Sequence, residues 1–128
     1  MLKAREVMTK DVLCATPDLS LEEAVDILLY NKISGMPVCD GEGIVLGMIS
    51  ERDILNFVFS GNLKTTLVRE AMSTKIVSFS PEADIDVISL TMGEKKLRRV
   101  PIVENGKLLG IISRRSILRS VLSKPVYK

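Results

Sequence analysis

Two patterns of apolar residues alternate along the chain: a spacing of three to four residues, which is typical of helices, and short continuous runs, which are typical of strands. The first clear helical pattern follows Ser20. After Ser20, apolar residues recur three and four positions apart, as in the buried stripe of an amphipathic helix; they are Leu21, Ala24, Val25, Leu28 and Leu29. Ser20 and Glu23 match the Ser-x-x-Glu pattern of a capping box, in which each side chain satisfies a free N–H group of the other residue. The pattern predicts a helix that begins after Ser20 and that Gly35 ends.

Short apolar runs on either side of this helix predict strands. The first run covers residues 11–15 and stops at a Thr-Pro pair. The runs at 36–39 and 44–49 are separated by Asp-Gly-Glu-Gly, a turn sequence, and therefore predict an antiparallel hairpin. Ser50 then precedes a second helical stretch of about ten residues that should end near Gly61.

The second half of the chain presents the same succession. Its expected elements are a strand at 75–79, a helix capped by Asp84, strands at 100–103 and 108–112, and a helix capped by Ser113 that runs to about Leu122. Asn105-Gly106 between the two later strands is a strong signal of a two-residue hairpin turn, because both central residues need a positive φ. Glycines at 41, 43, 47, 106 and 110 are expected to serve turns and bulges.

The recurrence extends to individual residues at a spacing of 64. Met8, Pro17, Lys32 and Pro37 recur as Met72, Pro81, Lys96 and Pro101. After a slip of one residue, Gly47, Ile49, Ser50, Arg52, Ile54, Leu55 and Val58 recur as Gly110, Ile112, Ser113, Arg115, Ile117, Leu118 and Val121. We interpret the chain as an α/β (α+β) protein of two tandem β-α-β-β-α repeats, 1–62 and 63–128. Neither repeat has enough apolar area to stand alone, so we expect them to pack sheet to sheet with pseudo-twofold symmetry.

Composition adds an uneven distribution of charge to this picture. Residues 1–64 carry six Lys and Arg against ten Asp and Glu, whereas residues 65–128 carry twelve against six. Oppositely charged halves could attract each other within a chain or across a dimer, and the basic half could attract phosphates. The alternative is a solvated charge pattern without function. With 46% apolar residues and no Trp, the core must be largely aliphatic.

The cysteines and the longest apolar runs indicate a cytoplasmic protein. Cys14 and Cys39 lie in apolar, strand-like surroundings and outside any Cys-x-x-Cys motif, which favours buried free thiols over a disulfide. No apolar run reaches the roughly 18 residues of a membrane span, and the N-terminus lacks the apolar core of a signal peptide. We expect no membrane association and no metal site.

The residue types present argue against an enzyme. The chain has no His, which is the commonest general base and metal ligand. Neither cysteine has an imidazole to activate it, and no Gly-x-Ser-x-Gly or paired-carboxylate motif occurs. We therefore expect no catalytic residues.

Several motifs, found in order in both repeats, resemble those of the CBS domain pair, or Bateman module, a family named for cystathionine β-synthase. The opening motif is Val7-Met8-Thr9 and again Ala71-Met72-Ser73. The hydrophobic-Pro-hydrophobic step is Met36-Pro37-Val38 and Val100-Pro101-Ile102. The Gly-x-x-Ser-x-x-Asp finish is Gly47–Asp53, which becomes Gly110–Ser116 in the second repeat. The resemblance covers nearly the whole chain and is closest to the stand-alone prokaryotic type.

The resemblance implies two clefts for adenine nucleotides, each built from both repeats. By position, cleft one would combine Ser80 with Ser34, Gly35, Met36, Ile49, Ser50, Arg52 and Asp53. Cleft two would combine Thr16 with Arg98, Arg99, Val100, Ile112, Ser113, Arg115 and Ser116. The implied ligand is AMP, ADP, ATP or S-adenosylmethionine, held as a regulator with no catalytic cofactor.

The side chains suggest different chemistry for the two clefts. A carboxylate such as Asp53 can accept hydrogen bonds from both ribose hydroxyls, and Ser50 begins a helix whose N–H groups favour phosphate oxygens. Ser116 stands where the family has its ribose aspartate, and Gly35 stands where the second repeat has Arg99. Cleft one is thus suited to a ribose but poor in cations, and cleft two is the reverse.

Each feature also has a purely structural interpretation. Ser50 and Asp53 could form only a helix cap, and Arg98 and Arg99 only a solvated segment. Thr16 and Ser80 could simply end strands before prolines.

We expect a regulatory module that binds an adenosine-containing ligand and signals to an unknown effector protein through the geometry of a homodimer. The dimer faces would come from Ile54, Leu55, Val58, Phe59, Ile117, Leu118, Val121 and Leu122. The alternative is a ligand-free structural or protein-interaction module that dimerises. Nucleic-acid binding through the basic half is disfavoured, because the net charge is only +2 and aromatic residues for base stacking are few.

Overall fold

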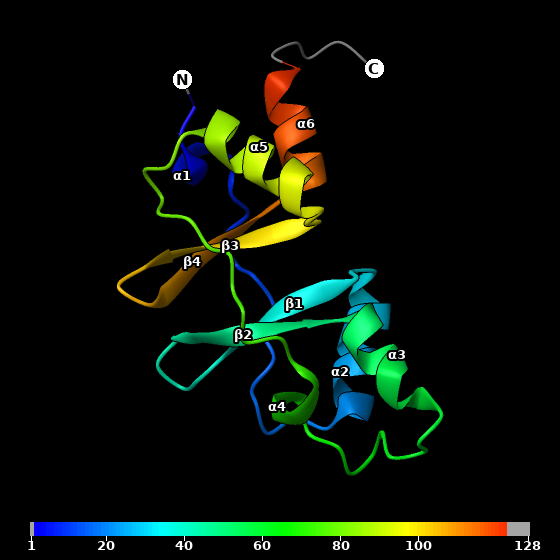
Figure 1. Cartoon of the computed structure of the whole chain (residues 1–128). Coiled ribbons are helices and arrows are strands. Elements are labelled where there is room, and N and C mark those ends of the chain that lie inside the picture. The colour runs from blue at the N-terminus through cyan, green and yellow to red at the C-terminus, as the bar shows by residue number, and fades with distance from the viewer. Residues whose placement is uncertain (1, 123–128) are drawn as a thin grey trace. The chain divides into compact units, whose positions relative to one another are not determined.

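The computed structural model describes residues 2–122 and contains helices and two small antiparallel sheets (Figure 1), which confirms the predicted α+β class. In chain order the elements are α1 (Ala4–Val7), α2 (Leu21–Asn31), β1 (Gly35–Cys39), β2 (Val45–Ser50), α3 (Glu51–Val58), α4 (Val68–Ala71), α5 (Ile85–Lys95), β3 (Arg99–Glu104), β4 (Lys107–Ser113) and α6 (Arg114–Val121). Residues 123–128, at the end of the second predicted repeat, lie outside the described part.

The chain divides into two compact units, each built around one hairpin. The β1–β2 unit comprises residues 13–76, and the β3–β4 unit comprises the described residues within 1–12 and 77–128. These units differ from the sequence repeats 1–62 and 63–128, because the short segment that leads into each repeat packs in the unit of the other repeat.

Both hairpins have the predicted antiparallel pairing and a similar irregularity. Met36 pairs with Ile49 in the first, and Val100 pairs with Ile112 in the second. The register shifts after Val38 in β1 and after Ile102 in β3. The turn at Asn105 and Gly106 has a positive φ at both residues, 53° and 81°, which confirms the hairpin signal of this dipeptide.

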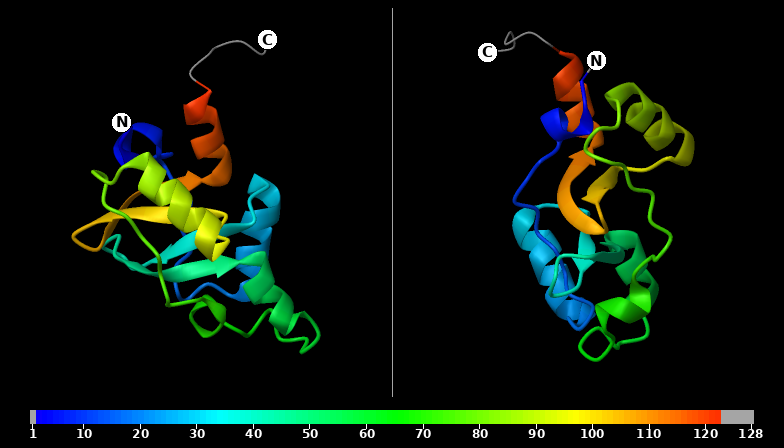
Figure 2. Two further views of the ribbon diagram at one scale, coloured as in Figure 1. Left: turned by 45° about the horizontal axis from the view of Figure 1, so that its top comes forward. Right: turned by 90° about the vertical axis from the view of Figure 1, so that its left-hand side faces the viewer.

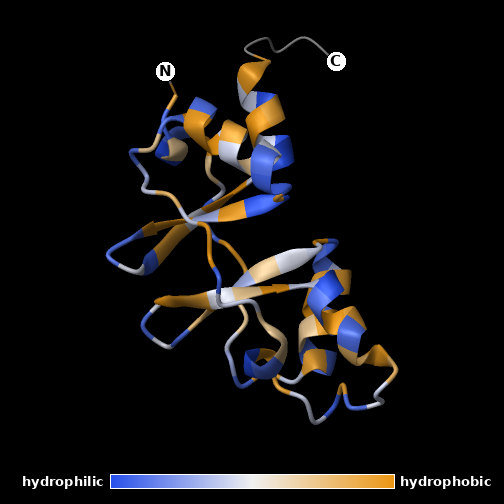
Figure 3. Cartoon of the chain, in the orientation of Figure 1, coloured by the Kyte–Doolittle hydropathy of each residue, from blue (hydrophilic) through white to orange (hydrophobic). Residues whose placement is uncertain are grey.

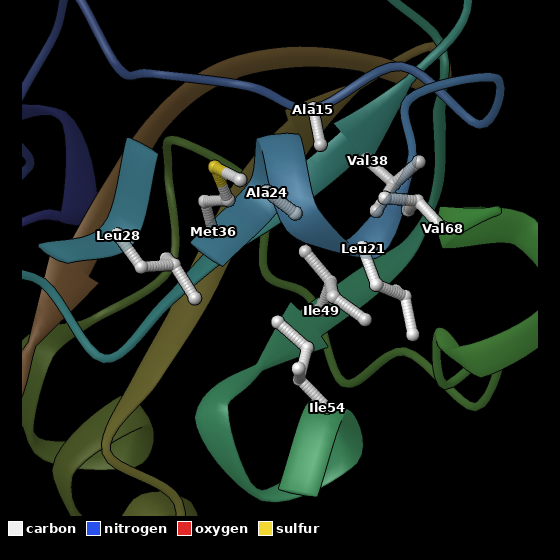
Figure 4. Close-up of a cluster of buried hydrophobic side chains, with 9 residues drawn as sticks. All are labelled: Ala15, Leu21, Ala24, Leu28, Met36, Val38, Ile49, Ile54 and Val68. Carbon is white, nitrogen blue, oxygen red and sulfur yellow. The ribbon is translucent and has the colours of Figure 1, made fainter. Parts of the chain in front are cut away.

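An aliphatic core fills the β1–β2 unit between its hairpin and the helices α2 and α3. Leu21, Ala24 and Leu28 contribute the apolar stripe of α2, and Ile54 contributes that of α3. Figure 4 shows these side chains meeting Met36, Val38 and Ile49 of the hairpin, with Ala15 and Val68 completing the cluster. Burial of a Leu or Ile side chain contributes about 1.5–3 kcal/mol, so this cluster is the main stabilising element of the unit.

The β3–β4 unit has an equivalent core. Its buried side chains are Ala4, Ile85, Ile88, Met92, Val100, Ile102, Ile112 and Ile117. Figures 1 and 2 show α5 and α6 next to each other on one side of the β3–β4 hairpin. The helices of the chain carry both hydrophobic and hydrophilic residues (Figure 3), as the predicted amphipathic pattern requires.

The predicted helix starts are correct, but α5 lacks the expected side-chain cap. The capping box of Ser20 and Glu23 is present, with the Ser20 Oγ accepting from Glu23 N at 3.1 Å. Asp84 occupies the N-cap position of α5, but its carboxylate accepts a hydrogen bond from Lys3 Nζ at 2.5 Å instead of capping the helix. The predicted side-chain cap by Asp84 is therefore wrong, because an ion pair competes for the carboxylate.

The end of the first long helix also differs from the prediction. Lys32 adopts the left-handed conformation with φ 54° and ends α2, three residues before the expected Gly35, which instead begins β1. Lys96 ends α5 in the same way. The recurrence of these two lysines thus marks equivalent C-caps, although this conformation is usually taken by glycine or asparagine.

The strands predicted at 11–15 and 75–79 reduce to single-residue bridges. Ala15 pairs in parallel with Val38, and Phe79 pairs in parallel with Ile102, so each sheet has two strands instead of the expected three. The reason is the short stretch available for pairing. A proline follows two residues after each bridge and has no N–H to continue the ladder, and Asp11 has a positive φ of 51°, which bends the chain before the first bridge.

The helix α1 leads into the first repeat but packs in the β3–β4 unit. Ala4 N donates to Ala83 O at 2.8 Å and Arg5 N donates to Pro81 O at 3.0 Å, while Arg5 forms an ion pair with Glu82. The first turn of α1 is therefore satisfied by the bend that precedes α5.

The helix α4 repeats this arrangement in the β1–β2 unit. Val68 N donates to Leu19 O at 2.8 Å, Arg69 N donates to Pro17 O at 3.1 Å, and Arg69 forms an ion pair with Asp18. The two sets of contacts involve equivalent positions 64 residues apart. The exchange of lead-in segments is therefore a property of the repeat and occurs twice.

Candidate functional site

The end of the β1–β2 hairpin brings most of the residues predicted for cleft one together. Antiparallel pairing places Gly35 beside Ser50 and Met36 beside Ile49. Glu51 N, at the first position of α3, donates to Ser34 O at 2.9 Å. The backbone before the proline step therefore lies against the start of α3, with Arg52 and Asp53 in its first turn.

Ser50 and Asp53 form a reciprocal cap at this helix start. The Asp53 Oδ2 atom accepts from both Ser50 N and Ser50 Oγ at 2.9 Å, and Asp53 N donates to Ser50 Oγ at 3.3 Å. The capping interpretation is thus confirmed, and it holds the carboxylate in one orientation. The cap uses only the Oδ2 atom of Asp53, and the Oδ1 atom is not part of it. The Asp53 side chain is half-buried.

We call residues 34–36 together with 49–53 the first frame. Residues 98–100 together with 112–116, at the end of the β3–β4 hairpin, form a second frame with different chemistry. Arg99 pairs with Ser113, Val100 pairs with Ile112, and Arg114 N donates to Arg98 O at 3.0 Å. The Ser116 hydroxyl takes the place of the Asp53 carboxylate. It lies 2.9 Å from Ser113 Oγ and accepts from Ser113 N at 3.3 Å, so the helix cap survives without a negative charge.

The guanidinium groups near the second frame differ in how they are held. Arg114 Nε donates to Leu97 O at 2.9 Å, which ties that side chain to the backbone. Arg98 and Arg115 are exposed, and Arg99 is half-buried. The second frame therefore combines a neutral cap with four arginines among its own residues, whereas the first combines a carboxylate with the exposed Arg52.

Thr16 and Ser80 each lie in a different unit from the other residues predicted for the same cleft. Thr16 is in the β1–β2 unit and Ser80 is in the β3–β4 unit, and both are exposed. Ser80 Oγ accepts from Glu82 N at 3.0 Å, so this hydroxyl shapes the bend before α5. Their assignment to clefts that combine the two units stays a prediction.

A groove within the β3–β4 unit was not predicted from the sequence. It has a volume of about 350 Å³ and is lined by Leu2, Glu6, Val7, Thr9, Ser116, Arg119 and Ser120. Only Ser116 among these was a candidate. The others come from α1 and its flanking residues Leu2 and Thr9, and from the last turn of α6. No local motif indicates that this lead-in segment packs here.

Two further features of the described residues bear on function. None of the helices within residues 2–122 is both long and apolar enough to cross a bilayer. Over the same residues, no group of three or more Cys, Asp and Glu side chains is arranged to hold a metal ion.

Comparison with known sequences identifies the family of this chain. The model of the CBS domain matches the chain twice, over residues 4–60 and 68–123. The chain is 32% identical over 114 residues to the CBS domain-containing protein YhcV of Bacillus subtilis, covering 88% of this chain and 81% of YhcV. It is 33% identical over 118 residues to inosine-5'-monophosphate dehydrogenase of Methanocaldococcus jannaschii, covering 91% of this chain but only 23% of that enzyme.

Solved structures agree with this result. The chain superimposes on CBSX2, crystallised in complex with AMP, with a TM-score of 0.87 and 26% identity over 95% of this chain and 97% of CBSX2. For AcuB of Vibrio cholerae the TM-score is 0.88 and the identity 26%, over 95% of this chain and 91% of AcuB. With a CBS domain in each of its two repeats, the chain belongs to the CBS domain family as a tandem pair.

Proposed function

We propose that the chain senses an adenosine-containing nucleotide and passes its ligand state to a partner protein. The observation that carries this proposal is the first frame, in which the cap of α3 fixes the Asp53 carboxylate beside the backbone of residues 34–36. CBSX2, which is 26% identical and has the same fold, binds AMP. The chemistry of the frame fits such a ligand.

In the first frame, Asp53 would hold the ribose. A carboxylate accepts hydrogen bonds from two vicinal hydroxyls, and the cap leaves Oδ1 outside its own hydrogen bonds. The backbone around Met36 would read the adenine edge, and phosphate oxygens would face the N–H groups at the start of α3. Ser80 is proposed to complete this cleft.

In the second frame, cations would dominate recognition. Ser116 is a weaker anchor for a diol than a carboxylate, because hydrogen bonds to charged groups are worth about 1.5–3 kcal/mol and neutral ones about 1 kcal/mol. Arg98, Arg99 and Arg115 would instead attract phosphate groups. We therefore propose that the nucleoside part binds in the first frame, with Thr16 assigned to the second.

Isothermal titration calorimetry of the full chain with AMP, ATP and S-adenosylmethionine tests the proposal. At least one of the three should bind with saturable heat, and GMP, which has the same ribose and phosphate but a different base edge, should bind more weakly. Absence of heat with all three adenosyl compounds, in protein with a cooperative unfolding transition, would contradict the sensor function.

The exposed apolar faces of the helices favour a second role, in homodimer formation. Ile54 and Ile117 are buried against their own sheets, whereas Leu55, Phe59 and Leu118 are 62%, 99% and 62% exposed. Further exposed apolar side chains on the same helices and their neighbours are Leu29, Tyr30, Val58, Val87, Leu90, Val121 and Leu122. Apolar faces of this kind support association of two copies, with or without a ligand.

Sedimentation equilibrium checks the dimer. The wild-type chain should sediment at about twice its 14.1 kDa mass, and the double variant Leu55→Glu with Phe59→Glu should sediment as a monomer. Leu109→Glu, which places the same charge on β4 at a 37% exposed position, is the matched control and should remain dimeric. A monomeric wild-type chain would refute the dimer.

A further inference from the structure

The two cysteines are in contact and differ in their environments. Cys39 Sγ donates a hydrogen bond to Cys14 Sγ at a separation of 3.6 Å. Cys39 is 5% exposed, whereas Cys14 is exposed. The expected burial is confirmed for Cys39 and wrong for Cys14, and the two sulfurs are not joined in a disulfide, as expected. No part of the proposed nucleotide site uses either sulfur.

The parallel bridge between Ala15 and Val38 explains how residues far apart in the sequence meet. Ala15 N donates to Pro37 O and Cys39 N donates to Ala15 O, both at 2.9 Å. Side chains alternate across an extended backbone, and Ala15 and Val38 both point into the core. Cys14 and Cys39, their neighbours, therefore share the opposite face.

The environments give the two sulfurs different reactivity. Burial raises the pKa of the Cys39 thiol to about 12, with the hydrogen bond to Cys14 as the next cause. Cys39 therefore keeps its proton at neutral pH and is shielded from solvent. Cys14 is open to solvent, so a reagent can reach its sulfur, whereas the Cys39 sulfur can be reached only through Cys14.

We propose that Cys14 and Cys39 form a reversible intramolecular disulfide, in which Cys14 is the attacking sulfur and Cys39 the resolving one, with a small aliphatic disulfide as the oxidant.

The exchange takes place in two balanced steps. The Cys14 thiolate attacks one sulfur of the small disulfide, forms a mixed disulfide and releases one small thiolate. The Cys39 sulfur then attacks Cys14 Sγ, the bond from Cys14 to the small thiol breaks, and the Cys39 proton passes to the leaving thiolate. The protein loses two hydrogens, and the small disulfide is reduced to two thiols.

The backbone around Cys14 can accommodate the bond. A disulfide has an S–S length of about 2.05 Å, so the two sulfurs must approach by about 1.5 Å from their present separation. Cys14 lies outside regular secondary structure, and Ala15 is the single bridge between its segment and β1. A rotation of both side chains with a small shift of this segment closes the distance and leaves the hairpin pairing unchanged.

The disulfide would add a covalent link between Cys14 and Cys39 next to the bridge between Ala15 and Val38. It joins positions on either side of α2, so it restricts the unfolded chain across a whole helix and fixes the segment that precedes Thr16 on β1. This effect concerns the β1–β2 unit alone and is independent of any nucleotide.

Incubation of the full chain with oxidised glutathione, followed by alkylation with a maleimide and intact mass spectrometry, tests the proposal. The expected product is a single chain without a covalent link to a second chain. It should be lighter by two hydrogens, carry no maleimide or glutathione, and have Cys14 and Cys39 linked in the peptide map. Its melting temperature should exceed that of the reduced chain by roughly 5–10 °C, and a reducing agent should reverse the shift.

Two single variants separate the roles of the sulfurs. Cys39→Ser should stop at the mixed disulfide and carry one glutathione on Cys14. Cys14→Ser should remain unmodified on the same timescale, because Cys39 is buried. If the buried hydroxyl prevents Cys39→Ser from folding, Cys39→Ala serves the same purpose.

Three results would overturn the proposal. They are a wild-type chain that keeps both thiols free, a wild-type chain that retains glutathione on Cys14 without resolving it, and modification of Cys14→Ser as fast as the wild type.

Discussion

Replacing Gly47 by alanine is expected to lower the free energy of unfolding by about 3 kcal/mol, the upper part of the range for overpacked sites. A Cβ at Gly47 would lie 2.6 Å from Ser73 O and 3.0 Å from Met72 Sδ. Ser73 O accepts from Met48 N, and Ser73 N donates to Met48 O, both at 2.9 Å. The backbone that follows α4 must therefore move away from β2 and lose these hydrogen bonds.

Gly110 is the equivalent position, and the same substitution there should have a similar effect. A Cβ would lie 2.7 Å from Thr9 O, which accepts from Ile111 N in the matching pairing. Urea denaturation followed by circular dichroism measures both variants. Gly93→Ala in α5 is the matched control, because nothing lies within 4 Å of its Cβ, and it should raise stability by about 0.5–1 kcal/mol. Unchanged stability of Gly47→Ala would refute the close approach.

Asp53→Asn is expected to weaken AMP binding by roughly 10–100-fold, on the basis that hydrogen bonds to a charged group contribute about 1.5–3 kcal/mol. This prediction depends on the proposed function. The asparagine side-chain oxygen can still accept from Ser50 N, so the cap and the fold should be retained. Calorimetric titration with AMP gives the affinity, and urea denaturation shows whether the cap persists.

Glu51→Gln provides the matched control for Asp53. Glu51 lies at the first position of α3 and is exposed, so its substitution removes one negative charge from the same helix end without touching the proposed ribose anchor. Its effect on AMP affinity should be no more than about threefold. If Asp53→Asn bound AMP as tightly as the wild type, the assignment of Asp53 to the ribose would be wrong, while the cap would stand.

The glycines show which roles a local sequence pattern can predict and which it cannot. Gly43 and Gly106 have positive φ angles of 85° and 81° and serve hairpin turns, as predicted. Gly47 and Gly110 do lie beside the irregular pairings of β2 and β4, as expected of bulges. Their closest neighbours, however, are backbone atoms of segments distant in sequence. A local pattern can report a turn, but it carries no signal of which other segment approaches.

In the candidate site, too, some contacts could be predicted from the sequence and others could not. The family resemblance implied the grouping of residues 34–36 with 49–53, and of 98–100 with 112–116. The observed hairpin pairing brings these residues together, and the sequence predicted the two hairpins from their turn signals. The cap of Asp53 on Ser50 follows from a spacing of three residues. By contrast, the contact of Cys14 with Cys39 and the groove beside Ser116 depend on packing that no periodicity encodes.

The sequence by itself determined the four longer helices α2, α3, α5 and α6, the two hairpins, and the capped starts of α2, α3 and α6, because each depends on contacts between near neighbours in the chain. The short helices α1 and α4 were not predicted. The tertiary structure alone decided that α1 packs in the β3–β4 unit and α4 in the β1–β2 unit, and that the predicted strands before Pro17 and Pro81 shrink to single bridges. These features depend on hydrogen bonds between segments far apart in the sequence, and spacing along the chain does not record which segments meet.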